Sequence, residues 1–317
     1  MKWKKLGKIF DPTTHPAFSQ FKGYAQSPQT LELEDRIRVY FSIRKADESG
    51  KFISYISFVD YDKEFKGIIN TSTEQVIELG DLGTFDEHGI FPINPLQYED
   101  KIYAYTCGWS RRVSVSVETS TGLAISNDGG YTFKKIGHGP VFSSSLHEPF
   151  LVGDSFVRVY NNVFHMWYIY GTKWTKFENE NAPDRVYKIA HATSNDGLNW
   201  QRDGRAIVHD KLNDDECQAL PSVLYWNGRY HMFFCYRYAT GFRNNKNRGY
   251  RIGYAYSDDL EGWNRDDELG AIGVSESGWD SDMLCYPHIF QVANRVYLLY
   301  NGNEFGKYGF GLAILEG

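Results

Sequence analysis

The sequence predicts an all-β protein, a five-bladed β-propeller with four antiparallel strands in each blade. Three features lead to this fold class: a long period, an apolar run that recurs at a fixed place in each period, and a polar turn that recurs later in it. Five pivot positions mark the period, and successive pivots lie 63 to 66 residues apart (Pro28, Pro92, Ser155, Pro221 and Pro287). Self-similarity at a fixed period is the sequence signature of repeat architectures.

Each period can be divided into four short strands. An apolar run follows every pivot, as at residues 36–41, 229–234 and 295–300. A third run then leads into a turn rich in Ser, Asn, Asp and Gly, and a fourth run opens with an aromatic residue (residues 126–133, 194–200 and 257–263). Asn, Asp and Gly tolerate positive φ and suit tight hairpin turns. The pattern therefore predicts four antiparallel strands per period.

The N-terminal stretch is expected to complete the last blade. Only about thirty residues follow Pro287, which is enough for three strands. Residues 3–9 resemble the fourth strands expected at residues 133–137 and 200–204. The two ends of the chain should then pair in one blade of a single domain that covers residues 1–317. A β-sandwich with coincidental spacing is the alternative fold.

Composition excludes several classes of protein. The 317 residues carry 34 Lys and Arg against 40 Asp and Glu, so no net positive field attracts nucleic acid. Nowhere do eighteen apolar residues run together, and no apolar signal segment follows the basic start, so we expect a cytoplasmic protein with no membrane partner. The four cysteines lie far apart and are expected to be reduced. Nucleotide-binding glycine motifs and zinc-type spacings are missing from the sequence, so neither a cofactor nor a metal is expected.

Three carboxylates stand at equivalent places in the repeat. Glu87, Glu216 and Asp282 each lie five residues before a pivot, where the chain enters the first strand of a blade. First strands line the axis of a propeller, so the three acids are expected to converge in its central funnel. Converging carboxylates repel one another, which allows one to be protonated while another is ionised, as glycosidic cleavage requires. Alternatively, such acids bind backbone N–H groups or Arg side chains and only hold the blades together.

The loops between the second and third strands, and residues near the axis, supply candidate substrate-binding groups. Aromatic rings stack on sugar rings, and basic side chains bind hydroxyls or anionic groups. The basic run at residues 243–248 would suit a carboxylated or phosphorylated ligand. The expected partner is thus a carbohydrate, neutral or anionic. The candidate binding residues are His88, Trp109, Glu148, Lys173, Trp174, Arg237 and Tyr286.

With these features the chain resembles the five-bladed β-propeller glycoside hydrolases, the superfamily that includes families 32, 43, 62, 68 and 130. The resemblance covers nearly the whole chain and rests on the period, on the acid-x4-Pro openings and on the Ser-Asn-Asp-Gly-x-x-Trp turn that ends at Trp200. The Glu-Cys pair at Glu216 and Cys217 is similar to the acid/base pair of family 32. The resemblance implies glycosidic-bond cleavage with Glu216 as general acid and either Glu87 or Asp282 as its ionised partner.

The chain also departs from that superfamily. The first blade opens with residues 23–28 (Gly-Tyr-Ala-Gln-Ser-Pro), which contain no acid where these families usually place the nucleophile or base. Hydrolysis is the favoured reaction. A phosphorylase of the family 130 type, with Arg237, Lys173 and His88 holding the phosphate, is an alternative. A non-catalytic glycan-binding propeller in surface-polysaccharide metabolism is another, because fold alone does not decide function.

Overall fold

The computed structural model describes residues 1–72, 74–176, 182–213 and 215–316. Within these residues the chain is built mainly of strands, so the prediction of an all-β protein is confirmed. Helical structure among them is confined to a 3₁₀ turn at Pro16–Phe18 and to two four-residue segments, α1 (Asp267–Gly270) and α2 (Asn303–Gly306). No helix in this described part has the length and apolar character needed to cross a membrane.

The described strands form five four-stranded antiparallel units. The first unit contains β2 (Gln26–Glu32), β3 (Ile37–Ala46), β4 (Phe52–Tyr61) and β5 (Ile68–Thr71). The second unit contains β6 (Gly89–Tyr98), β7 (Lys101–Arg111), β8 (Val117–Ser126) and β9 (Lys134–Lys135). A single parallel bridge between Ser54 and Gly89 joins these two units into one eight-stranded sheet.

The remaining units are separate four-stranded sheets. The third unit contains β10 (Val152–Tyr160), β11 (Val163–Thr175), β12 (Asp184–Ser194) and β13 (Gln201–Arg202). The fourth unit contains β14 (Cys217–Trp226), β15 (Arg229–Arg237), β16 (Arg251–Ser257) and β17 (Asn264–Arg265). The fifth unit contains β18 (Cys285–Val292), β19 (Arg295–Asn301), β20 (Phe310–Glu316) and β1 (Lys2–Phe10).

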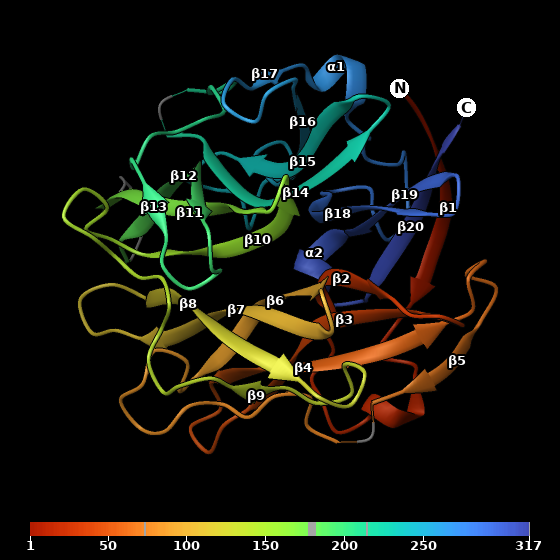
Figure 1. Cartoon of the computed structure of the whole chain (residues 1–317), viewed down its shortest axis with the longest axis horizontal. Coiled ribbons are helices and arrows are strands. Elements are labelled where there is room, and N and C mark those ends of the chain that lie inside the picture. The colour runs from red at the N-terminus through yellow and green to blue at the C-terminus, as the bar shows by residue number, and fades with distance from the viewer. Residues whose placement is uncertain (73, 177–181, 214, 317) are drawn as a thin grey trace.

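The two ends of the chain meet in the fifth unit. Strand β1 pairs antiparallel with β20, from Lys2 opposite Glu316 to Phe10 opposite Phe310. Figure 1 shows the two termini close together on the outer side of this sheet. The expected pairing of the N-terminal stretch with the last repeat is therefore confirmed.

The first strand of each unit is the innermost one. Figure 1 shows β2, β6, β10, β14 and β18 around a common centre, and each contacts the first strand of the next unit, with β18 also contacting β2. Hydrophobic clusters fill the space between neighbouring units, as where Leu299 of the fifth unit and Val39 of the first share one cluster. Full burial of one such side chain stabilises the fold by about 1.5–3 kcal/mol. The loops that enter the first strands are thereby held near one another.

In the second and third units the recurring polar turn accepts a hydrogen bond from the preceding unit. In the second unit the Ser126 hydroxyl bonds the Asp128 carboxylate and accepts the N–H of Gly130. The hydroxyl of Tyr40, on β3 of the first unit, donates to the Gly130 carbonyl over 2.6 Å. Gly130 has φ +82°, and a Cβ there would lie 2.4 Å from the Tyr40 oxygen. Glycine is therefore required at this turn by both conformation and space.

Candidate active site

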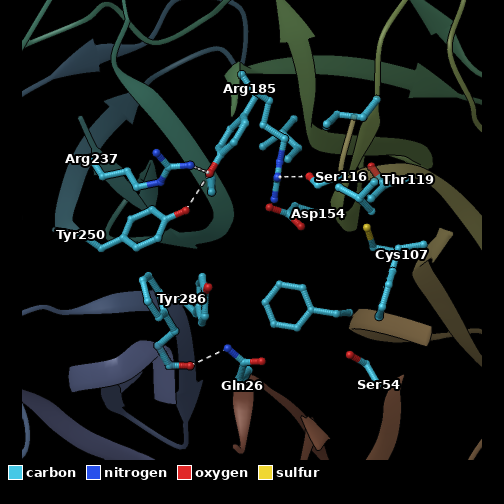
Figure 2. A pocket seen from close by; sticks show the side chains of 18 of the residues that line it. Gln26, Ser54, Cys107, Ser116, Thr119, Asp154, Arg185, Arg237, Tyr250 and Tyr286 are labelled. Carbon is cyan, nitrogen blue, oxygen red and sulfur yellow. Dashed lines mark hydrogen bonds between the residues drawn. The ribbon is translucent and has the colours of Figure 1, made fainter. Parts of the chain in front are cut away.

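A cavity of about 380 Å³ lies where the five units meet, and side chains from all five line it. This volume falls within the usual range for a small-molecule site. Aromatic rings form much of the wall, and Figure 2 shows Tyr250, Tyr286 and their neighbours turned toward the open centre. Among the described residues, the cavity is lined by one carboxylate and four guanidinium groups (Asp154, Arg44, Arg185, Arg237 and Arg243).

A β-bulge in the first strand of the third unit places Asp154 in the cavity. The register between β10 and β11 shifts between Gly153 and Phe156, so Asp154 and Ser155 form the bulge, and Asp154 has φ 51°. The same shift occurs at the pivot in all five first strands. Bulges redirect side chains and are frequent next to active sites. The residue before the pivot, and not the one five places before it, is thus the position that lines the cavity in the second, third and fifth units (Phe91, Asp154 and Tyr286).

Burial makes Asp154 a weaker acid than an ordinary aspartate. Its side chain is only 8% exposed, and desolvation raises its pKa from 3.8 to about 7. A hydrogen bond from the backbone N–H of Leu220 and the nearby charge of Arg185 act in the opposite direction, but they do not cancel the effect of burial on the pKa. Asp154 is therefore partly protonated at neutral pH. A carboxyl group in this state can donate a proton to a leaving group.

Arg237 is a buried cation with no carboxylate partner among the described residues. Its side chain is 2% exposed and packs over the Phe242 ring at 3.5 Å. The guanidinium donates to the Tyr238 carbonyl over 2.8 Å and to the Tyr187 hydroxyl over 3.0 Å, while its Nε is buried without a hydrogen-bond partner. Burying a cation is costly unless it is paired. Arg237 therefore offers an unused donor to an anion in the cavity.

Arg185 is the cation nearest to the carboxylate in Figure 2, which shows it above Asp154. Its Nη1 donates to the Ser116 hydroxyl over 3.3 Å. Its guanidinium also lies 5.5 Å from the centre of the Trp174 ring. Asp154 and Arg185 together place a proton donor beside an anion-binding group.

The structure does not bring the three acids predicted from the repeat into this cavity. Glu216 is fully buried and its Oε1 forms an ion pair with Arg265 on β17 at 2.6 Å. Its Oε2 accepts the backbone N–H groups of Lys211 and Leu212, each at 2.9 Å. With both oxygens occupied in this way, Glu216 holds the loop that enters β14 against the outer strand of the same unit.

The same acid clamp recurs in three further units. In each, an acid of the loop that enters the first strand pairs with a basic residue of the fourth strand, at 2.7 to 2.9 Å. The four pairs are Asp86 with Lys135, Glu148 with Arg202, Glu216 with Arg265, and Asp280 with Lys5. We call these four acids the clamp acids. A structural role of the entrance acids fits all four pairs, each of which lies within one unit; two of the partners are Arg, as that alternative expected, and two are Lys.

Glu87 and Asp282 lie next to clamp acids, and neither lines the cavity. Glu87 accepts the N–H of Gly83 over 2.8 Å and lies 3.2 Å from His88 Nδ1. Asp282 is exposed, and one of its oxygens accepts the Ser281 hydroxyl over 3.3 Å. None of Glu87, Glu216 and Asp282 is thus among the residues that line the cavity, and the side chain of each bonds groups of its own unit.

The predicted binding residues divide into two groups. Trp109, Arg237 and Tyr286 line the cavity. The other four lie outside its lining: His88 stacks on Trp109, Glu148 is a clamp acid, Lys173 pairs with Asp215 at 2.6 Å, and Trp174 packs against the core between the third and fourth units. Burial and the charge of Arg111 lower the pKa of His88.

The sequence-based prediction of the site did not include several residues that line the cavity, among them Asp154, Arg44, Arg185 and Gln26. The sequence did contain a sign that Asp154 is special, because this residue directly precedes Ser155, the only pivot that is not proline. Arg44 also had a signal, because it stands sixteen residues after Pro28, as Arg237 stands sixteen residues after Pro221. Gln26 had none, since no glutamine stands two residues before any other pivot. No group of His, Cys, Asp and Glu in the described part of the chain is arranged to hold a metal ion.

Solved structures share this fold. A glycoside hydrolase superposes with a TM-score of 0.76 at 15% identity, covering 99% of this chain and 91% of that one. The RGII complex of BT0996 gives 0.75 at 14%, with the same coverage. The β-1,2-mannobiose phosphorylase from Listeria innocua, in complex with β-1,2-mannobiose, gives 0.69 at 12%, covering 100% and 97%. The predicted resemblance to the propeller glycoside hydrolases is thus confirmed at the level of the fold.

Sequence relatives define the family more narrowly. No family model matches the chain. The uncharacterized proteins Rv1502 and MT1551 of Mycobacterium tuberculosis are each 31% identical to it over 317 residues, and the match covers the whole of each protein. The chain belongs to the same family as these two proteins.

Proposed function

We propose that the chain is a single-domain, five-bladed β-propeller enzyme, spanning residues 1–317, that cleaves a glycosidic bond of a carbohydrate by phosphorolysis. The observation that carries this proposal is the composition of the cavity wall. A single carboxyl group among the described lining residues, Asp154, faces four arginines there, and its pKa of about 7 suits proton donation. The successive contacts of the five first strands support the ring of five blades.

Phosphorolysis fits this wall better than hydrolysis does. Hydrolysis at a glycosidic carbon uses two carboxyl groups, one as acid and one as base or nucleophile. The described lining of the cavity offers only Asp154. Phosphate is already an anionic nucleophile and needs no second carboxylate to activate it. Arginine side chains bind phosphate through charge-assisted hydrogen bonds.

In the proposed reaction Asp154 donates its proton to the glycosidic oxygen. A phosphate oxygen, held by Arg185 and Arg237, attacks the anomeric carbon as the bond from that carbon to the glycosidic oxygen breaks. The products are a sugar 1-phosphate and the remainder of the substrate, which is released with a free hydroxyl group. The Asp154 carboxylate then regains a proton from solvent. A single displacement of this kind inverts the anomeric configuration.

The neighbouring structures support this proposal only through their fold. One neighbour with this fold is described as a glycoside hydrolase and another as a phosphorylase, so the fold is compatible with both hydrolysis and phosphorolysis.

The cysteines give separate support for the further proposal of a cytoplasmic enzyme. All four are free and buried, as expected for a reducing compartment.

The test is the dependence of turnover on inorganic phosphate. The purified protein is incubated with a panel of oligosaccharides, with and without phosphate, and products are analysed for sugar 1-phosphates. We expect cleavage only with phosphate, and incorporation of ³²P into the released sugar. Equal cleavage in phosphate-free buffer, with free reducing sugar as the product, would show hydrolysis. Sugar binding without any product would show a glycan-binding protein.

A further inference from the structure

The cavity carries a second unpaired arginine on the wall opposite the proposed phosphate-binding groups. Arg44 lies on β3 of the first unit, directly across from Ser54 on β4. Figure 2 shows Ser54 and Gln26 on one side of the cavity, and Arg185 and Arg237 on the other. The cationic groups therefore occupy two separate walls.

Within the described part of the chain, Arg44 has neither an ion pair nor a side-chain hydrogen bond, and its Nε is buried and unpartnered. Its guanidinium lies over the Tyr24 ring at 4.5 Å and near the Phe52 ring at 5.5 Å. The acid that follows β3, Asp47, does not neutralise it, because Asp47 pairs with Arg111 at 2.7 Å. Stacking fixes the guanidinium in place and leaves its hydrogen-bonding edge unused.

Gln26 adds a second unused polar group to the same wall. Its side chain is 1% exposed and its Nε2 donates to the Phe305 carbonyl over 2.6 Å. Its Oε1 is buried with no hydrogen-bond partner among the described residues. Buried polar groups are rarely left unsatisfied, and those that are demand an explanation. A free acceptor beside an unpaired cation and two aromatic rings fits a sugar that carries a negative charge.

We infer that Arg44 binds an anionic substituent of the sugar substrate, so that the enzyme acts on acidic and not on neutral glycosides. This inference rests on the proposed function and adds the class of substrate. Gln26 Oε1 accepts a sugar hydroxyl, and the Tyr24 and Phe52 rings contact the sugar. The anionic substituent is a carboxylate or a phosphate ester, both of which match a planar guanidinium. Because the two cationic walls are separate, inorganic phosphate and the charged sugar bind in the cavity at the same time.

The inference is tested by isothermal titration of the full-length protein in phosphate-free buffer. Hexuronates and hexose 6-phosphates are each compared with the corresponding neutral hexose, so that the two kinds of anionic substituent are distinguished. We expect the preferred anionic sugar to bind at least tenfold more tightly than its neutral partner, which is the order expected for a hydrogen bond to a charged group. In Arg44→Gln this preference should disappear.

A matched control is available on the same strand. Lys45 follows Arg44 on β3 and is exposed, so Lys45→Gln removes one positive charge without touching the cavity. We expect Lys45→Gln to retain the full preference for the anionic sugar. Equal affinity for anionic and neutral sugars in the wild-type protein, or a preference that survives Arg44→Gln, would overturn the inference.

Phosphate binding distinguishes this inference from the proposed function. Inorganic phosphate is titrated into the wild type, Arg44→Gln and Arg185→Gln. We expect Arg44→Gln to keep the phosphate affinity of the site at Arg185 and Arg237, and Arg185→Gln to weaken it. An Arg44-dependent preference for acidic sugars without phosphate dependence of turnover would contradict phosphorolysis and leave the acidic-sugar site standing. Phosphate-dependent turnover without an Arg44-dependent preference for acidic sugars would overturn the acidic-sugar site and leave phosphorolysis standing.

Discussion

Two kinds of buried acid lie at the inner ends of the repeats, and they differ in their partners. Each clamp acid binds a basic residue of the fourth strand at 2.6 to 2.9 Å, as Glu216 binds Arg265. Asp154 is also buried, but it forms no ion pair in the described structure, and burial raises its pKa to about 7. Depth of burial alone therefore does not identify a catalytic acid. The presence or absence of a basic partner on the fourth strand separates the two kinds.

The largest expected effect is on activity at Asp154. Asp154→Asn keeps the shape of the side chain and removes the proton donor. We expect kcat to fall by about 10²–10⁴-fold, the usual contribution of general acid catalysis. Steady-state kinetics on the substrate found in the panel measures the loss. For the wild type, kcat/KM should also decline above pH 7, because the fraction of protonated Asp154 decreases there.

The matched control for this variant is Glu216→Gln, in which a clamp acid is changed in the same way. Assayed at a temperature where it is folded, Glu216→Gln should retain most of the wild-type kcat. A large loss of kcat in folded Glu216→Gln, with little loss in Asp154→Asn, would restore Glu216 as the general acid and contradict the comparison.

The next largest effect is on stability at Glu216. Removing one partner of a buried ion pair leaves the other charge uncompensated and costs about 3–5 kcal/mol. Glu216→Gln should therefore lower the free energy of unfolding, but by less than that amount, because Arg265 loses its partner Glu216 and keeps its second ion pair, with Asp267 at 3.1 Å. Urea denaturation followed by far-UV circular dichroism measures the change.

A double variant tests the cause of that loss. Glu216→Gln combined with Arg265→Met removes both charges of this pair and leaves Asp267 with Lys211 as its remaining basic partner, at 3.2 Å. We expect the double variant to recover part of the stability, because a buried ion pair replaced by apolar groups is often tolerated. If the double variant were less stable by the sum of the two single losses, the ion pair would not be the reason for the effect.

Asp154→Asn should change stability in the opposite direction. The pKa of Asp154 is raised on folding, so the folded state binds the proton more tightly than the unfolded state does. Stability is then lost as the pH rises from about 4 to about 7, and the loss is complete above that window. At pH 8 the Asn variant should be more stable than the wild type by roughly 4 kcal/mol at most, since one pKa unit is about 1.4 kcal/mol. At pH 4 the two proteins should unfold at similar urea concentrations, and a difference that does not vary with pH would contradict this prediction.

The comparison also shows why the fold could be predicted from the sequence and the site only in part. The repeat is encoded locally, by apolar runs and by turns such as the one at Gly130, so the pivots coincide with the bulges of all five first strands. The acids were harder to interpret, because their role depends on a partner that is distant in the sequence, at the other end of the chain in the case of Asp280 and Lys5. An aromatic-x-basic pattern in four fourth strands, as in Trp263-Asn264-Arg265, was the available sign of that partner.

The residues of the opposite wall could be predicted from the repeat only in part. Gln26 occurs at its position in one unit only, so the repeat gives no reason to select it, whereas Arg44 stands at the position that Arg237 occupies in the fourth unit. Their significance arises from what the tertiary structure leaves unpaired, the Arg44 Nε and the Gln26 Oε1. A search for equivalent positions would thus have found Arg44 from Arg237, but not Gln26.

The smallest expected effect is at Asp282, which sharpens the contrast with Asp154. Both are aspartates close to a pivot, but Asp282 is exposed and its carboxylate accepts a hydrogen bond from the Ser281 hydroxyl. Asp282→Asn should change the free energy of unfolding by less than about 0.5 kcal/mol, as is usual for surface substitutions. Its kcat should stay within about twofold of the wild type, because no charge of the cavity wall is altered. A loss of activity comparable to that of Asp154→Asn would mean that the exposed loop carrying Asp282 folds into the cavity when substrate binds, and the second carboxylate required for hydrolysis would then be present.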